Sequence, residues 1–199
     1  MNTGDARTEI MRSIRTHLAA SAPYDGRESQ MNTDVGKSVS QRAVASLVEE
    51  FKRNLEAVDG HCIIVHNEAE LAEALKSITN GKKVATSNVP PSTKDLFNFD
   101  VGVTRAQAGI AETGTLVLDS SVEHNRLISL VPPVHIAILD ASRIHATLAE
   151  TLAMLQSGDE VSPAITFITG PSRTADIELT LAIGVHGPQE LYVIILQDN

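Results

Sequence analysis

One carboxylate stands in a turn rich in glycine and threonine, within the segment Gly-Ile-Ala-Glu-Thr-Gly-Thr (109–115). Glu112 could act there as a general base, as a nucleophile or as an anchor for a hydroxylated ligand. Gly114 can adopt a positive φ and let a ligand approach the backbone, while Thr113 and Thr115 add hydroxyl groups. The alternative is an exposed glutamate that merely supports its loop.

A second candidate site is the polar segment Thr-Gly-Pro-Ser-Arg-Thr-Ala-Asp-Ile-Glu (169–178). We predict a strand that ends at Thr169 and a helix over residues 174–183. Free N–H groups at such a helix start, beside the positive charge of Arg173, would attract a carboxylate or a phosphate. Ordinary capping by Thr174 is the alternative, and both can hold together. The candidate ligand-binding residues of this segment are Gly170, Ser172, Arg173, Thr174, Asp176 and Glu178.

Histidine and arginine side chains add three isolated candidates. His186, in Gly-Val-His-Gly-Pro (184–188), could donate to a ligand or titrate near neutral pH, although a structural loop histidine is the alternative. Arg126 could pair with an acidic ligand or with Glu112. His135 begins an apolar run and is expected to be a core histidine. The seven histidines show no metal-ligand spacing and no Gly-x-Gly-x-x-Gly occurs, so we expect neither a metal nor a standard dinucleotide site.

The elements that must position these residues follow from an aliphatic composition. The 199 residues are 42% hydrophobic but only 3% aromatic, which favours a buried parallel sheet covered by helices. Short apolar runs alternate with helical patterns, so we predict an α/β fold with a single mostly parallel sheet flanked by helices. The expected strands are 62–65, 83–86, 101–105, 115–119, 134–139, 164–169 and 191–196. The expected helices are 37–58, one after a capping box at 67–70, a turn at 93–97, one from about 144 to 158, and 174–183.

Two parts of the chain differ in composition. Residues 1–36 are expected to form a short amphipathic helix, over 5–18, followed by a polar linker, and residues 37–199 the α/β domain. The net charge of -9 and the lack of a basic stripe argue against a nucleic-acid binder. No apolar run reaches the roughly 20 residues of a membrane span. The polar N-terminus is unlike a signal peptide, so a cytoplasmic protein is expected.

Cys62 is the only cysteine of the chain and lies in an apolar run. It therefore excludes an internal disulfide and a four-thiolate iron–sulfur cluster held by this chain alone. We expect it to be a buried structural thiol.

Four segments together resemble the LUD domain, and within that family the lactate utilisation protein C branch, over about residues 40–196. The segments are 109–115, Asn-Arg-Leu-Ile-Ser-Leu-Val-Pro-Pro-Val-His-Ile (125–136), 169–178 and 184–188. The resemblance implies a fold similar to the sugar-phosphate isomerase and CoA-transferase superfamily. It also implies a role in oxidising L-lactate to pyruvate beside two iron–sulfur-containing partner proteins.

Three functions remain open at this point. The first is a non-redox component of an L-lactate utilisation system, with no cofactor in this chain and iron–sulfur clusters in its partners. It would bind a small organic anion through residues 112–115, Arg126 and the helix start at 172–174. The second is an independent enzyme acting on a sugar phosphate or an acyl thioester, with Glu112 or Glu178 as base, or with Glu112 as nucleophile as in CoA transferases. The third is a ligand-sensing module.

Overall fold

The computed structural model describes residues 8–13, 15–16, 43–86, 95–123, 125–156, 162–175, 181–183 and 187–197. The chain divides into two units, residues 1–39 and 40–199. In the first unit, residues 8–13 and 15–16 are helical, inside the helix predicted over 5–18. None of the helices in these described ranges has the length and apolar character needed to cross a membrane.

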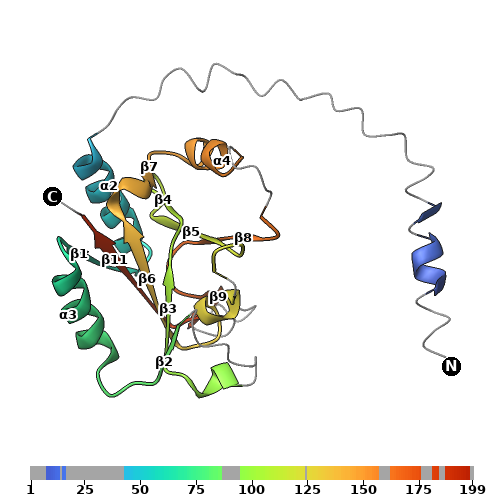
Figure 1. Ribbon diagram of the computed structural model, residues 1–199, viewed down its shortest axis with the longest axis horizontal. Helices are drawn as coiled ribbons and strands as arrows, with labels where there is room; N and C mark the ends of the chain where they lie inside the picture. The colour runs from blue at the N-terminus through green and yellow to red at the C-terminus, as the bar shows by residue number, and fades with distance from the viewer. Residues whose placement is uncertain are drawn as a thin grey trace. The chain divides into compact units, whose positions relative to one another are not determined.

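The second unit is built on a five-stranded parallel sheet (Figure 1). Its central strands are rich in Val, Ile and Leu, as expected for strands buried on both faces. The predicted α/β fold with a mostly parallel sheet flanked by helices is confirmed. In spatial order the strands are β1 (His61–Val65), β11 (Glu190–Leu196), β6 (Val134–Asp140), β3 (Val101–Arg105) and β2 (Val84–Thr86).

Two helices cover opposite faces of this sheet. Helix α2 (Val44–Glu56) buries an apolar stripe against the face that carries Ala137 and Leu139 of β6. Helix α3 (Glu68–Thr79) packs Leu71 against the other face, which carries Ile136. Successive residues of a strand point to opposite faces of its sheet, so α2 and α3 each cover one face. The stripe of α2 consists of Leu47, Val48, Phe51 and Leu55.

The predicted capping box at the start of α3 is confirmed. Asn67 Oδ1 accepts a hydrogen bond from the Glu70 N–H at 2.9 Å. Glu70 Oε2 accepts in return from the His66 N–H at 2.8 Å, so both side chains satisfy free donors at the helix start. The helix predicted over 37–58 is observed as α2, and residues 37–42 lie outside the described ones.

A second, four-stranded sheet lies beside the first and was not predicted. The strands predicted over 115–119 and 164–169 belong to this second sheet, not to the single sheet that was expected. Residue 144, expected in a helix, begins its strand β7. Helix α4 (Leu148–Gln156) follows β7 and packs Met154 and Leu155 on this sheet. In spatial order the strands are β7 (Ile144–His145), β4 (Ala108–Ile110), β5 (Thr115–Asp119) and β8 (Ile165–Ile168).

The helix predicted over 174–183 is wrong. Strands β9 (Arg173–Ala175) and β10 (Leu181–Ile183) pair antiparallel there, with Arg173 opposite Ile183. The cap-like residue Thr174 lies within the strand β9, so cross-strand pairing prevails over the local capping preference, and residues 176–180 lie outside the described ones. Among the described residues, short 3-10 helices are η2 (Asp95–Asn98), η3 (Arg126–Ser129) and η4 (Ala141–Arg143). The first of them overlaps the turn predicted over 93–97.

Candidate functional site

The turn that carries Glu112 packs on the C-terminal half of α2. Gly114 has φ 63°, and a Cβ placed there would lie 2.3 Å from the backbone nitrogen of Leu55. Asn54 Nδ2 donates to the Ala111 carbonyl at 2.7 Å and fixes the turn from the same helix. The glycine is therefore required by the close approach of two backbones.

Glu112 itself stabilises the start of α4. Its Oε1 accepts a hydrogen bond from the Leu148 N–H at 2.7 Å, although the two residues are 36 positions apart. Thr147 and Glu150 form a second capping pair, because Thr147 Oγ1 accepts from the Glu150 N–H at 3.2 Å. Among the described residues no ion pair joins Arg126, which lies on η3, to Glu112.

Hydrogen bonds join three of the four segments singled out in the sequence. Thr115 Oγ1 lies 2.7 Å from Thr113 Oγ1 and 2.6 Å from Thr169 Oγ1, so the Glu112 turn contacts the end of β8. The Ser172 N–H donates to the Pro188 carbonyl at 2.9 Å, which brings the 184–188 segment alongside. These contacts bring the three segments together near the C-terminal end of α2.

The 169–173 segment crosses the end of α2. Gly170 has φ 77°, and a Cβ there would lie 2.6 Å from the Val58 carbonyl oxygen. Arg173 pairs with the exposed Asp59. Because β9 begins at Arg173, no helix start exists at this point, and the expected anion site formed by its N–H groups is absent. Thr174 lies in β9, while the predicted site residues Asp176, Glu178 and His186 lie outside the described residues.

An open cavity of about 700 Å³ lies at the amino ends of β1 and β11, and we name it the amino-edge cavity. Its charged groups are two carboxylates and one guanidinium, and that guanidinium, Arg173, is already paired. The rings of His61 and Tyr192 stack with their centroids 4.6 Å apart. The lining residues are Glu56, Asp59, Gly60, His61, Cys62, Ile63, Pro171, Arg173, Gln189 and Tyr192.

Burial dominates the electrostatics of this cavity and of the nearby core. It raises the pKa of Cys62 to about 12, which keeps the thiol protonated. Burial also lowers the pKa of His135 to about 4. The expected core position of His135 is confirmed; its Nε2 lies 2.9 Å from Thr104 Oγ1, while its buried Nδ1 finds no hydrogen-bond partner within the described part of the chain.

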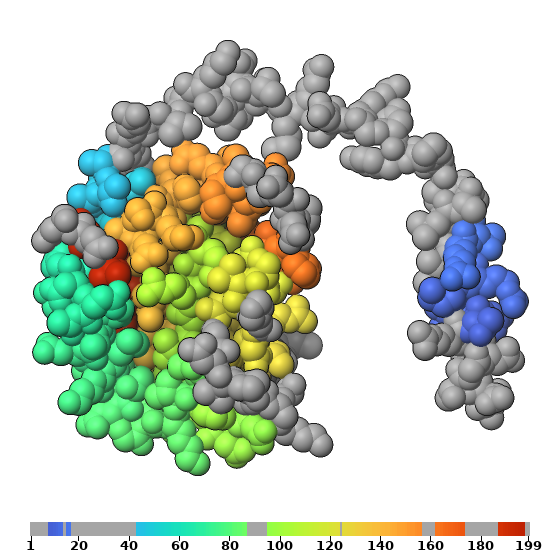
Figure 2. Space-filling model, in the orientation of Figure 1, coloured from blue at the N-terminus to red at the C-terminus, as the bar shows by residue number. Residues whose placement is uncertain are grey.

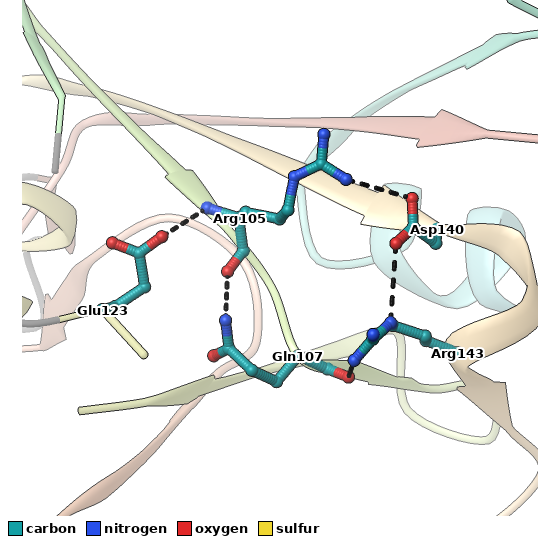
Figure 3. Close-up of polar contacts among 5 residues, drawn as sticks. All are labelled: Arg105, Gln107, Glu123, Asp140 and Arg143. Carbon is teal, nitrogen blue, oxygen red and sulfur yellow. Dashed lines mark hydrogen bonds and ion pairs between the residues drawn. The ribbon is translucent and has the colours of Figure 1, made fainter. Parts of the chain in front are cut away.

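A polar cluster at the carboxyl ends of the parallel strands escaped the sequence analysis (Figure 3). Arg105 ends β3, and its Nη1 donates to Asp140 Oδ1, at the end of β6, at 3.3 Å. Arg143 Nε lies 3.5 Å from Asp140 Oδ2, so one carboxylate holds two guanidinium groups. Gln107 closes the ring. Its side-chain Nε2 donates to the backbone carbonyl oxygen of Arg105 at 2.6 Å, and Arg143 Nη1 donates to the backbone carbonyl oxygen of Gln107 at 3.5 Å.

A cavity of about 500 Å³ opens next to this cluster, and we name it the carboxyl-edge cavity. Figure 2 shows the start of α2 (cyan), the segment that follows β6 (orange) and the end of β11 (red) coming together on one face of this unit. Ligands of open parallel sheets bind beyond the carboxyl ends of the strands, which is where this cavity lies. The lining residues are Val44, Asp140, Ala141, Ser142, Arg143, Leu196 and Gln197.

One sequence signal could have revealed this cluster. Arg105 and Asp140 each end an apolar strand that was predicted at nearly its observed position, and the ends of parallel strands share one edge of a sheet. Among the described residues, no group of three or more His, Cys, Asp or Glu side chains is arranged so that it could hold a metal ion.

Comparisons with known proteins agree with the fold. The family model described as LUD domain matches residues 92–196. An uncharacterised protein of Neisseria meningitidis is 41% identical over 128 residues, which cover 58% of this chain and 55% of that protein. This chain thus spans about half the length of that relative. A protein of an Exiguobacterium species named Lactate utilization protein C is 31% identical over 159 residues, 77% of this chain and 69% of that protein.

A solved structure is similar in fold. The crystal structure of a DUF162 family protein from Deinococcus radiodurans matches with a TM-score of 0.63 and 23% sequence identity. The match covers 78% of this chain and 99% of that one. The wider likeness to the sugar-phosphate isomerase and CoA-transferase superfamily stays a prediction.

Proposed function

The chain belongs to the LUD domain family, and on that premise we propose that it is a non-redox component of an L-lactate utilisation system. One observation carries the proposal: a relative named Lactate utilization protein C aligns with 77% of the chain at 31% identity. In this proposal the chain binds a small organic anion and acts with iron–sulfur-containing partner proteins.

The chemistry of lactate oxidation supports the assignment of redox centres to partners. Conversion of lactate to pyruvate releases two electrons and two protons, so an electron acceptor is required. Iron–sulfur clusters are held by several thiolates, and this chain has one cysteine, whose pKa is raised to about 12 by burial. Its residues therefore do not fit a cluster of their own, and its contribution is proposed to be binding.

Deletion of the gene in its host, followed by growth on L-lactate or on pyruvate as sole carbon source, tests the proposal. We expect growth on L-lactate to fail and growth on pyruvate to continue, with growth restored by the full chain supplied in trans. Normal growth of the deletion strain on L-lactate would contradict the proposal. Reduction of an artificial electron acceptor by the purified chain with L-lactate alone would contradict its non-redox part.

A further inference from the structure

We propose that the carboxyl-edge cavity binds the carboxylate of a small 2-hydroxy or 2-oxo acid and that Arg143 receives it. This inference deepens the proposed function, on which its choice of substrate class rests. It assigns the organic anion to a different place from the segments that the sequence pointed to, because the two ends of the parallel sheet differ in charge.

The arginine is held in place and still has donors to offer. Arg143 Nε lies 3.5 Å from Asp140, and Nη1 lies 3.5 Å from the Gln107 carbonyl oxygen. A guanidinium has five N–H donors in a planar fork, so the remaining ones can meet a carboxylate. The Arg143 side chain is 56% exposed, against 29% for Asp140, which leaves it accessible from the cavity.

The charge at this edge favours an anion. Arg143 and Asp140 line the cavity, and Arg105 pairs with Asp140 from next to it. The two arginines share the single carboxylate of Asp140, which leaves one positive charge in this group of three. Glu123 is not among the lining residues of this cavity: its Oε1 accepts from the Arg105 backbone N–H at 2.8 Å, and Figure 3 places it on the far side of Arg105 from Asp140. A monocarboxylate would balance the excess charge.

The rest of the lining suits a short organic acid. Val44, Ala141 and Leu196 provide apolar contacts for its carbon atoms. Ser142 and Gln197 carry groups that can donate to or accept from a hydroxyl or keto oxygen next to the carboxylate. The volume of about 500 Å³ lies within the usual range for small-molecule sites.

The amino-edge cavity does not have this excess of positive charge. Its guanidinium, Arg173, is matched by Asp59, and Glu56 adds a second carboxylate. An anion there would meet an excess of negative charge. The larger of the two cavities is therefore the poorer site for a carboxylate.

Isothermal titration of the purified full chain with L-lactate, pyruvate and inorganic phosphate tests this inference. Three variants are compared with the unaltered chain: Arg143→Gln, Arg173→Gln for the rival cavity, and Arg53→Gln, an exposed arginine of α2 that lines neither cavity. Thermal unfolding of each variant checks that the fold is kept. We expect saturable binding of L-lactate or pyruvate that Arg143→Gln weakens by about tenfold or more, since charge-assisted bonds are lost.

Several results would overturn the inference: no saturable binding of either acid, unchanged binding by Arg143→Gln, loss of binding in Arg173→Gln instead, or tighter binding of phosphate than of both acids. The growth experiment distinguishes a failure of this site assignment from a failure of the proposed function. If the chain is needed for growth on L-lactate but Arg143→Gln binds normally, only the site assignment fails. If binding depends on Arg143 but the deletion strain grows on L-lactate, only the proposed function fails.

Discussion

The two ends of strand β11 open on cavities of opposite character. The amino-edge cavity is larger, at about 700 Å³, and the 169–178 segment, which resembled a ligand site in the sequence, contributes Pro171 and Arg173 to its lining. Its arginine is neutralised and its cysteine is protonated. The carboxyl-edge cavity is smaller, at about 500 Å³, and its two neighbouring arginines share one aspartate. In this chain the residues that resemble a ligand site in the sequence make packing contacts, while the strand order places the arginine cluster of the proposed site.

The reactivity of Cys62 gives the largest expected effect, and it probes the amino-edge cavity. Burial raises the pKa of its thiol from 9.0 to about 12, so the thiolate fraction near neutral pH falls by about a thousandfold. We expect alkylation by iodoacetamide at about pH 8 to be slower in the folded chain than in the chain unfolded by denaturant by about that factor. Mass spectrometry over time measures both rates. Equal rates would show that burial does not hold this thiol protonated and would break the contrast between the two ends.

A substitution at Gly114 tests whether the glycine of the Glu112 turn is needed for packing. Gly114→Ala would place a Cβ 2.3 Å from the Leu55 nitrogen at φ 63°, and we expect it to lower the free energy of unfolding by about 3 kcal/mol or more. Gly81→Ala is the matched control, because Gly81 has φ 72° but no atom within 4 Å of the added Cβ. We expect that control to lose about 1 kcal/mol. Denaturant unfolding gives both values, and similar losses would contradict the packing role.

The buried histidine of β6 makes the sheet between the two cavities sensitive to acid. The pKa of His135 is lowered by burial from 6.5 to about 4, so between these values the unfolded chain binds a proton that the folded chain does not. Stability should fall as the pH falls through this window, by up to about 3 kcal/mol. His135→Gln keeps a polar partner for Thr104 and cannot titrate, so its unfolding free energy should depend less on pH over the same range. An unchanged pH dependence in that variant would exclude His135 as the cause.

Local sequence patterns predicted most of the fold. The strands over 101–105 and 115–119 are observed at the predicted positions, and the Asn67–Glu70 capping pair forms as expected. These features depend on neighbours in sequence. The prediction failed where residues that resemble a helix cap pair as the strands β9 and β10, and where the hairpin of β4 and β5 formed a second sheet.

The polar cluster could not be read from spacing alone. The cluster joins the end of β3, which carries Arg105, to the end of β6 and to η4, which carry Asp140 and Arg143. Arg105 reaches Asp140 only because β3 and β6 are neighbours in the sheet. Glu112 shows the converse case: a carboxylate in a ligand-like turn accepts its hydrogen bond from the start of α4. Which partner a charged side chain finds therefore depends on contacts between residues that are far apart in the sequence.

A crystal structure of the chain grown with L-lactate tests the contrast between the cavities most directly. We expect the carboxylate of lactate beyond the carboxyl ends of β6 and β11, with its oxygens about 2.8 Å from nitrogen atoms of the Arg143 guanidinium. Lactate bound beside Arg173 at the amino ends of the strands, or no lactate in the carboxyl-edge cavity at saturating concentration, would contradict this account.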